Sequence, residues 1–67
     1  MNNRKELALY IINLKIANSI KNNQEKDFNK FKENMQILYD EKNEIYNNNE
    51  QIIEKVLTVY LEEVKNK

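Results

Sequence analysis

The sequence contains no Cys, His, Gly, Pro or Trp, and each absence excludes a class of structure or chemistry. Without Cys there are no disulfides, and without Cys and His the chain lacks the usual ligands of zinc. Without Gly, a glycine-rich phosphate-binding loop cannot form. Gly and Pro are also the residues that most often interrupt helices, so their absence favours long helical segments. We expect no metal and no cofactor.

Side chains for covalent or acid–base catalysis are scarce as well. Ser19 and Thr58 are the only hydroxyl groups besides the tyrosines, and there is no His or Cys to act with them. Two acidic pairs have the spacing of neighbours on a helix: Glu41 with Glu44, and Glu50 with Glu54. No basic or metal-binding residue accompanies either pair in the sequence, which is typical of a solvated charged face. The sequence therefore predicts that the protein is not an enzyme.

The formal net charge is zero but unevenly distributed, because the first 22 residues have a net charge of +3. No segment is basic enough to indicate a nucleic-acid partner. The apolar-rich stretch 7–20 is interrupted by polar residues and is too short to span a bilayer, which argues against a membrane partner. With no secretory signal visible, we expect a cytoplasmic location. The bias toward Asn, Lys and Ile is typical of AT-rich genomes, such as those of low-GC bacteria and their phages.

Apolar residues recur at helical spacing, so the sequence predicts an all-α fold. The Asn-x-x-Glu pattern of a capping box precedes three apolar runs, at Asn3–Glu6, Asn22–Glu25 and Asn47–Glu50. Asn also tolerates the left-handed conformation that ends many helices, so an Asn cluster can end one helix and begin the next. We predict a single domain, residues 1–67, folded as an antiparallel three-helix bundle with helices near 4–21, 24–46 and 49–65.

A second architecture stays open at the Asn cluster, residues 47–49. The apolar heptad pattern keeps one phase from Phe28 to Val59, straight through this cluster. A continuous helix of roughly 40 residues would be about 60 Å long. Three interior Asn residues would cost on the order of 2 kcal/mol in helix propensity, which tertiary packing could offset. The alternative fold is a helical hairpin with one long second helix, dimerising as a coiled-coil bundle.

The first predicted helix carries apolar residues on two nearly opposite faces. One stripe contains Leu7, Tyr10, Ile11, Leu14 and Ala17, and the other contains Leu9, Ile12, Ile16 and Ile20. Polar residues, among them Arg4 and Lys15, separate the two stripes. A monomeric three-helix bundle covers one side of each helix, so it would leave one stripe in water. An exposed apolar patch of that size marks an interaction site.

These observations predict a homodimer with the first helix near the two-fold axis and the third helix beside it. Small domains usually need such support, and here disulfides and metals are excluded. The expected interface residues are Leu9, Ile12, Ile16, Ile20, Tyr10, Val59 and Leu61. In the alternative arrangement the second stripe is the core of one chain, and Tyr10 with Ile11 faces the partner.

The function expected from the sequence is that of a small non-enzymatic module that self-associates and binds another protein as an adaptor, inhibitor or regulator. The alternative is a nucleic-acid-binding transcriptional regulator, because the positive charge is concentrated in the first helix.

Overall fold

The computed structural model describes residues 3–22 and 26–65, which form three helices and no strand. The first two helices are α1 (Asn3–Lys21) and α2 (Phe28–Tyr46). The third consists of α3 (Glu50–Lys55), a π-helical turn η1 (Val56–Tyr60) and α4 (Leu61–Lys65) in direct succession. The prediction of three helices is therefore confirmed. Residues 26 and 27 are not helical, so the second helix begins later than the expected residue 24.

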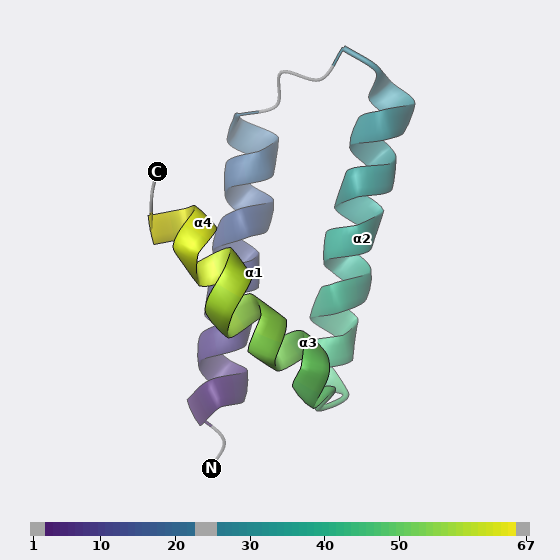
Figure 1. The fold of residues 1–67 in the computed structure, drawn as a ribbon. Helices are drawn as coiled ribbons and strands as arrows, with labels where there is room; N and C mark the ends of the chain where they lie inside the picture. Colours follow the sequence, from purple (N-terminus) through teal and green to yellow (C-terminus); the bar gives the residue numbers. More distant parts are fainter. Residues whose placement is uncertain (1–2, 23–25, 66–67) are drawn as a thin grey trace.

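The third helix crosses over the pair formed by α1 and α2 (Figure 1). α1 contacts every other helical segment. The neighbouring residues Arg4 and Lys5 show on which sides of α1 the other helices lie. Arg4 bonds to Glu50 and Glu54 in the third helix, whereas Lys5 donates to the backbone oxygen of Tyr46 at the end of α2. Successive residues on a helix are about 100° apart. The two helices therefore pack on adjacent sectors of α1, and the opposite sector stays uncovered.

The Asn cluster breaks the chain between α2 and α3, so the long-hairpin alternative is wrong. Asn48 has a φ of 62°, in the left-handed region. The Asn48 N–H bonds to the oxygen of Ile45, and the Asn49 N–H bonds to the oxygen of Glu44, each at 3.0 Å. These two bonds are the Schellman arrangement that ends helices, with Asn in the position usually taken by Gly. An uninterrupted heptad pattern does not prevent this break, because the break is fixed by local backbone bonding.

The expected capping boxes are displaced from their predicted positions. Asn49, rather than Asn47, begins α3: its side-chain oxygen accepts from the backbone N–H groups of Gln51 and Ile52 at 3.1 and 3.4 Å. Asp27, rather than an Asn, caps α2. Asn3 is the first residue of α1, Asn22 follows its end, and Glu25 lies outside the described residues. Asp and Asn cap equally well, so the pattern alone could not select between them.

Substitution of Asn48 tests the left-handed position directly. We expect Asn48→Ala to lower the free energy of unfolding by about 1 kcal/mol, because Ala lacks the short polar side chain whose local hydrogen bonds let Asn tolerate positive φ. Asn48→Gly should be about neutral, since Gly adopts this conformation freely. Urea denaturation of the three proteins gives both values. If Asn48→Ala were instead stabilising by a few tenths of a kcal/mol, as for an Asn inside a helix, the break at this residue would be contradicted.

The core lies where the three helices meet. Its buried residues are Ala8, Ile11, Ile12, Ile16, Met35, Leu38, Ile45, Ile53, Val56 and Tyr60. Ile11 comes from one apolar stripe of α1, whereas Ile12 and Ile16 come from the other. The polar seam that contains Arg4 and Lys15 lies between them and faces the third helix. Because these long side chains reach glutamates of the third helix, that helix can cover the seam. The residues of both stripes that adjoin the seam are therefore buried in the core.

Candidate functional site

A hydrogen-bonded group of three side chains joins α2 to the third helix. The Tyr60 hydroxyl donates to Oε1 of Glu41 at 2.6 Å, and Lys55 Nζ donates to Oε2 of the same carboxylate at 2.7 Å. Glu41 and Tyr60 are buried, and in the described part of the chain no buried side-chain polar atom lacks a partner. We call Glu41, Lys55 and Tyr60 the polar network. Since a buried carboxylate is stable only when it is paired, this network fixes how the third helix sits on α2.

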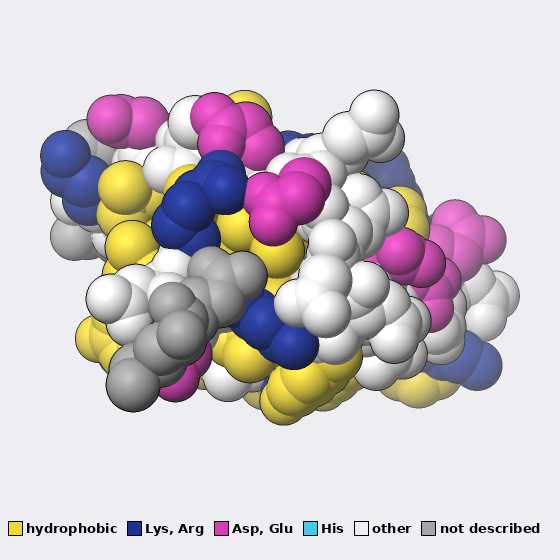
Figure 2. All heavy atoms as spheres, turned by 90° about the horizontal axis from the view of Figure 1, so that it is seen from below, with side chains coloured by type: hydrophobic (Ala, Val, Ile, Leu, Met, Phe, Trp, Pro, Cys, Tyr) yellow, Lys and Arg dark blue, Asp and Glu magenta, His cyan; other side chains and the backbone are white. Residues whose placement is uncertain are grey.

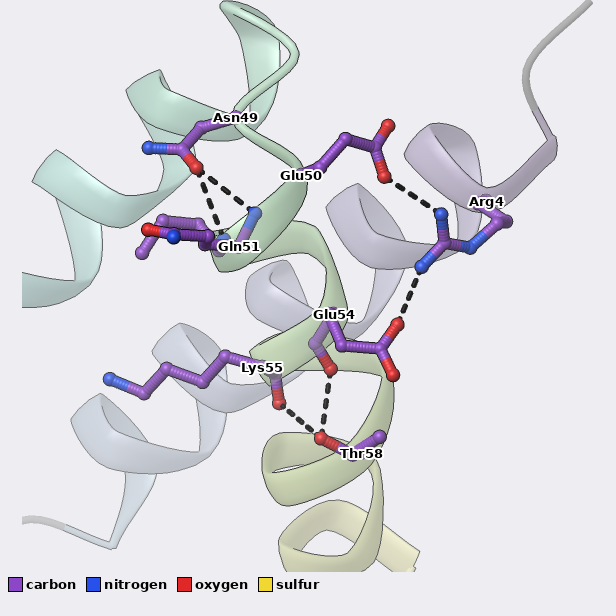
Figure 3. A network of polar contacts seen from close by, with 8 residues as sticks. Arg4, Asn49, Glu50, Gln51, Glu54, Lys55 and Thr58 are labelled. Atoms are coloured by element: carbon purple, nitrogen blue, oxygen red, sulfur yellow. Dashed lines mark hydrogen bonds and ion pairs between the residues drawn. The ribbon is translucent and has the colours of Figure 1, made fainter.

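Further ion pairs fasten α1 to the third helix. Arg4 lies between Glu50 and Glu54 and bonds to them at 2.8 and 2.6 Å (Figure 3). Lys15 pairs with Glu63, and its Nζ lies 4.6 Å from the centre of the Tyr60 ring. The expectation that Glu41, Glu50 and Glu54 have no basic companion is therefore wrong. Their partners are at least 14 residues away in the sequence, so helix-neighbour spacing could not reveal them.

The polar network raises the pKa of two of its members. The hydrogen bond to the Glu41 carboxylate is the main cause that raises the pKa of Lys55 above 10.5. Burial is the main cause that raises the pKa of Tyr60 above 10.0, and its hydrogen bond to Glu41 adds to this. Both shifts favour the protonated side chain in the folded state. These groups therefore stay protonated at neutral pH and act as hydrogen-bond donors.

The raised pKa values predict a loss of stability in alkaline solution. Because the folded state binds both protons more tightly than the unfolded chain does, the stabilisation is complete below the ordinary pKa values, 10.0 for Tyr and 10.5 for Lys. It is lost as the pH rises through the raised values. We expect the melting temperature to fall above about pH 10, and more shallowly in Tyr60→Phe, which has no phenol at position 60 to titrate. Circular dichroism melts across this range test it; equal slopes for both proteins would contradict it.

The predicted interface residues are divided between core and surface. Ile12 and Ile16 are buried within the single chain, so their side chains are not available to a partner in this fold. Leu9 and Leu61 are partly buried against the core. Tyr10, Ile20 and Val59 are about half exposed or more, and Tyr10 is the most exposed at 62%. Ile11, which the alternative arrangement turned toward a partner, is also buried. The interface role of the exposed residues stays a prediction.

Two strips of apolar side chains, most of them exposed, follow the helices. Leu7 and Tyr10, which are exposed, and Leu14, which is half-buried, lie on the sector of α1 that faces away from α2 and the third helix. Phe28, Tyr39 and Tyr46 follow one edge of α2. Figure 2 shows hydrophobic side chains gathered along the lower edge of the molecule when it is viewed from below. We refer to Leu7, Tyr10 and Leu14 as the α1 strip and to Phe28, Tyr39 and Tyr46 as the α2 strip.

Sequence reasoning missed the α2 strip. The wheel for the second helix places its apolar residues within an arc of roughly 120°, which suggests a single packing surface. In the structure α1 and the third helix cover one edge of that arc, where Leu38 and Ile45 lie, and leave the opposite edge with the aromatic residues open. The alignment of three aromatic residues on one edge was visible in the sequence. Which part of the arc would be covered depends on where the neighbouring helices pack.

Concave and metal-binding features are limited in the described residues. A groove of about 290 Å³ between α1 and α2 is lined by Lys15, Ser19, Asn34, Ile37 and Leu38. Among residues 3–22 and 26–65, no group of three acidic side chains could hold a metal ion. The Thr58 hydroxyl donates to the backbone oxygens of Glu54 and Lys55 (Figure 3).

In the part that the structure describes, no helix combines the length and apolar character needed to cross a membrane. No family model matches the chain, and no curated protein and no solved structure is significantly similar to it.

Proposed function

We propose that the protein is a non-enzymatic binding module that self-associates through its apolar helix surface and acts by contact with another protein. The observation that carries this proposal is the number of large apolar side chains left in water by a chain of 67 residues. They are Leu7, Tyr10, Ile20, Phe28, Ile37, Tyr39, Tyr46 and Val59. Single exposed apolar residues are common on protein surfaces, but aligned strips of them indicate interaction sites.

The α1 strip is the better surface for a second copy of the chain. In a two-fold dimer the same patch of each chain meets itself, so any charge on the patch faces an identical charge. Between Leu7 and Ala17, the uncovered sector of α1 carries no charged residue. Self-contact centred on this stretch therefore brings apolar side chains together, and the charged residues of the same sector, Glu6 and Lys21, lie at its two ends. This arrangement agrees with the sequence-based alternative in which Tyr10 faces the partner, but it assigns Ile11 to the core.

The size of an ordinary interface indicates that α4 takes part as well. A stable interface buries about 800 Å² of each partner, which is a substantial share of the 4976 Å² that the chain exposes. Three side chains of the α1 strip cannot supply this area. α4 contacts α1, and its Leu61 and Val64 are only partly buried. We therefore propose a dimer of antiparallel three-helix bundles in which α1 lies near the two-fold axis and α4 beside it.

Sedimentation of charged variants tests the proposal. We expect the wild type to be dimeric at tens of micromolar and Tyr10→Glu to be monomeric, because a charge would then meet its own copy across the axis. Tyr10 is exposed, so helical content measured by circular dichroism should not change. Ile37→Asp is the matched control, since Ile37 is also exposed but lies on α2; it should stay dimeric. A wild type that sediments as a monomer throughout this range would refute self-association.

A further inference from the structure

The α2 strip has a different chemical character from the α1 strip. Phe28, Tyr39 and Tyr46 are 68%, 45% and 53% exposed. At about 100° per residue they fall within roughly 20° of one another around the helix axis. The strip therefore runs the whole length of α2, about 27 Å at 1.5 Å per residue. A straight line of three aromatic side chains is suited to contact with another elongated element.

Lysines border this strip, and acidic residues do not. Lys32 and Lys42 lie within roughly 60° of it, one on either side, and the ammonium of Lys32 is 5.7 Å from the centre of the Phe28 ring. The exposed acidic residues of α2 lie roughly 100–140° away, on another face. These are Glu33, Asp40 and Glu44. The strip is thus a positively charged aromatic surface on a helix that also carries acidic residues elsewhere.

The packing of the bundle leaves this surface open. The third helix reaches α2 at Glu41, which bonds to Lys55 and Tyr60. Glu41 lies roughly 150° around α2 from the aromatic strip. Figure 1 accordingly shows the third helix on one side of the pair formed by α1 and α2. The α2 strip is available for a partner while the polar network holds the third helix in place.

We propose that the α2 strip is the docking surface for an acidic amphipathic helix of a partner protein. The three aromatic rings would contact the apolar face of that helix, and Lys32 and Lys42 would pair with Asp or Glu residues along its edges. Aromatic residues contribute strongly to binding at interfaces of this kind. This inference rests on the proposed function as a binding module, and it supplies the chemistry of the partner.

Charge complementarity selects this occupant over two others. A second copy docked through the same strip would bring the lysines of both chains together around a two-fold contact, which is unfavourable. A nucleic acid requires a continuous basic track. Here only two lysines border the strip, and the acidic face of the same helix would repel phosphates. An acidic helix meets both requirements of the surface, because it offers apolar side chains for the rings and carboxylates for the lysines.

Fluorescence anisotropy with a matched pair of designed peptides tests the proposal. Each peptide is an amphipathic helix of about 18 residues, the length of α2, with Leu at helical spacing. The first carries Glu at its flanking positions and the second carries Lys there. We expect the protein to bind the acidic peptide at micromolar concentration and the basic peptide at least tenfold more weakly. The double variant Lys32→Glu with Lys42→Glu should reverse this preference, whereas Lys30→Glu, on another face of α2, should not change it.

Several results would overturn the proposal. They are absence of binding to the acidic peptide, equal binding of both peptides, and binding that the double variant leaves unchanged. Tight binding of a single-stranded oligonucleotide that is lost in the double variant would assign the strip to nucleic acid instead. Tyr10→Glu separates this proposal from self-association: it should abolish the dimer and leave peptide binding within about twofold. Loss of peptide binding with self-association intact would refute the docking surface alone.

Discussion

Replacing Ile12 by Asp is expected to unfold the chain. The Ile12 side chain is 0% exposed and lies in the core between the helices. A carboxylate at this position would have no ionic partner, and the transfer of an unpaired charge into an apolar core costs several kcal/mol. A single core in a domain of fewer than about 70 residues rarely supplies more than 3–5 kcal/mol. The substitution therefore removes most or all of the stability, and a circular dichroism melt should show no cooperative transition.

Ile20→Asp is the control for this prediction. Ile20 belongs to the same sequence stripe as Ile12, but it is 54% exposed. We expect its free energy of unfolding, measured from the melting curve, to differ from that of the wild type by no more than about 0.5 kcal/mol, as for other surface substitutions. The opposite outcome is a folded Ile12→Asp protein that has lost only self-association. That result would return Ile12 to the interface predicted from sequence and would contradict its place in the core.

Replacing Glu41 by Ala is expected to have the second-largest effect, a loss of about 2–3 kcal/mol of unfolding free energy. The substitution leaves the buried Tyr60 hydroxyl without its acceptor, which by itself costs about 1–3 kcal/mol. It also removes the ionic partner of Lys55 and leaves a small cavity. The loss is limited because the Lys55 side chain is 44% exposed and can be solvated in place of the ion pair. Urea denaturation measures the change.

A double substitution tests whether the polar network acts as a unit. When Glu41→Leu is combined with Tyr60→Phe, both buried polar partners are replaced by apolar groups. We expect the double variant to be more stable than Glu41→Leu alone, because no hydroxyl is left without an acceptor. The sum of the losses of unfolding free energy in the two single variants should therefore exceed the loss in the double variant by about 1 kcal/mol or more. Strict additivity would show that Glu41 and Tyr60 contribute independently, and that the network does not position the third helix.

The Asn cluster shows what local patterns predict well and where they fail. That a break can occur at residues 47–49 follows from local chemistry, because Asn tolerates positive φ and its side chain accepts backbone N–H groups. The apolar pattern of the same segment also allowed one continuous helix, and the structure decided between the two. Which Asn performs each role did not follow. Asn48 adopts the left-handed conformation, and Asn49 caps α3 while its side-chain amide donates to Glu44 at 2.9 Å. The cap of α3 lies at Asn49, two residues after the predicted Asn47, because these bonds form together. A rule based on residue spacing considers each bond by itself.

The candidate surfaces depend more on tertiary packing than on pattern. The sequence shows that α1 has two apolar stripes, and it indicates that a chain of this length cannot hide both. It does not show that the polar seam of Arg4 and Lys15 would face inward, since charged residues ordinarily mark an exposed face. Their partners, Glu50, Glu54 and Glu63, are 46 or more residues away. The division of each stripe into buried and exposed residues follows from which helices pack on α1, and these distant pairs mark where the third helix lies.

The sequence by itself determined that this protein is helical and that residues 47–49 are the place where a long helix could be divided. Those properties depend on apolar periodicity and on backbone hydrogen bonds among residues close in the chain. Only the tertiary structure decided which apolar residues form the core and which form the α1 and α2 strips. The physical reason is that burial depends on the angle at which one helix crosses another. Here that angle is set by contacts such as Glu41 with Tyr60, which join residues far apart in the sequence.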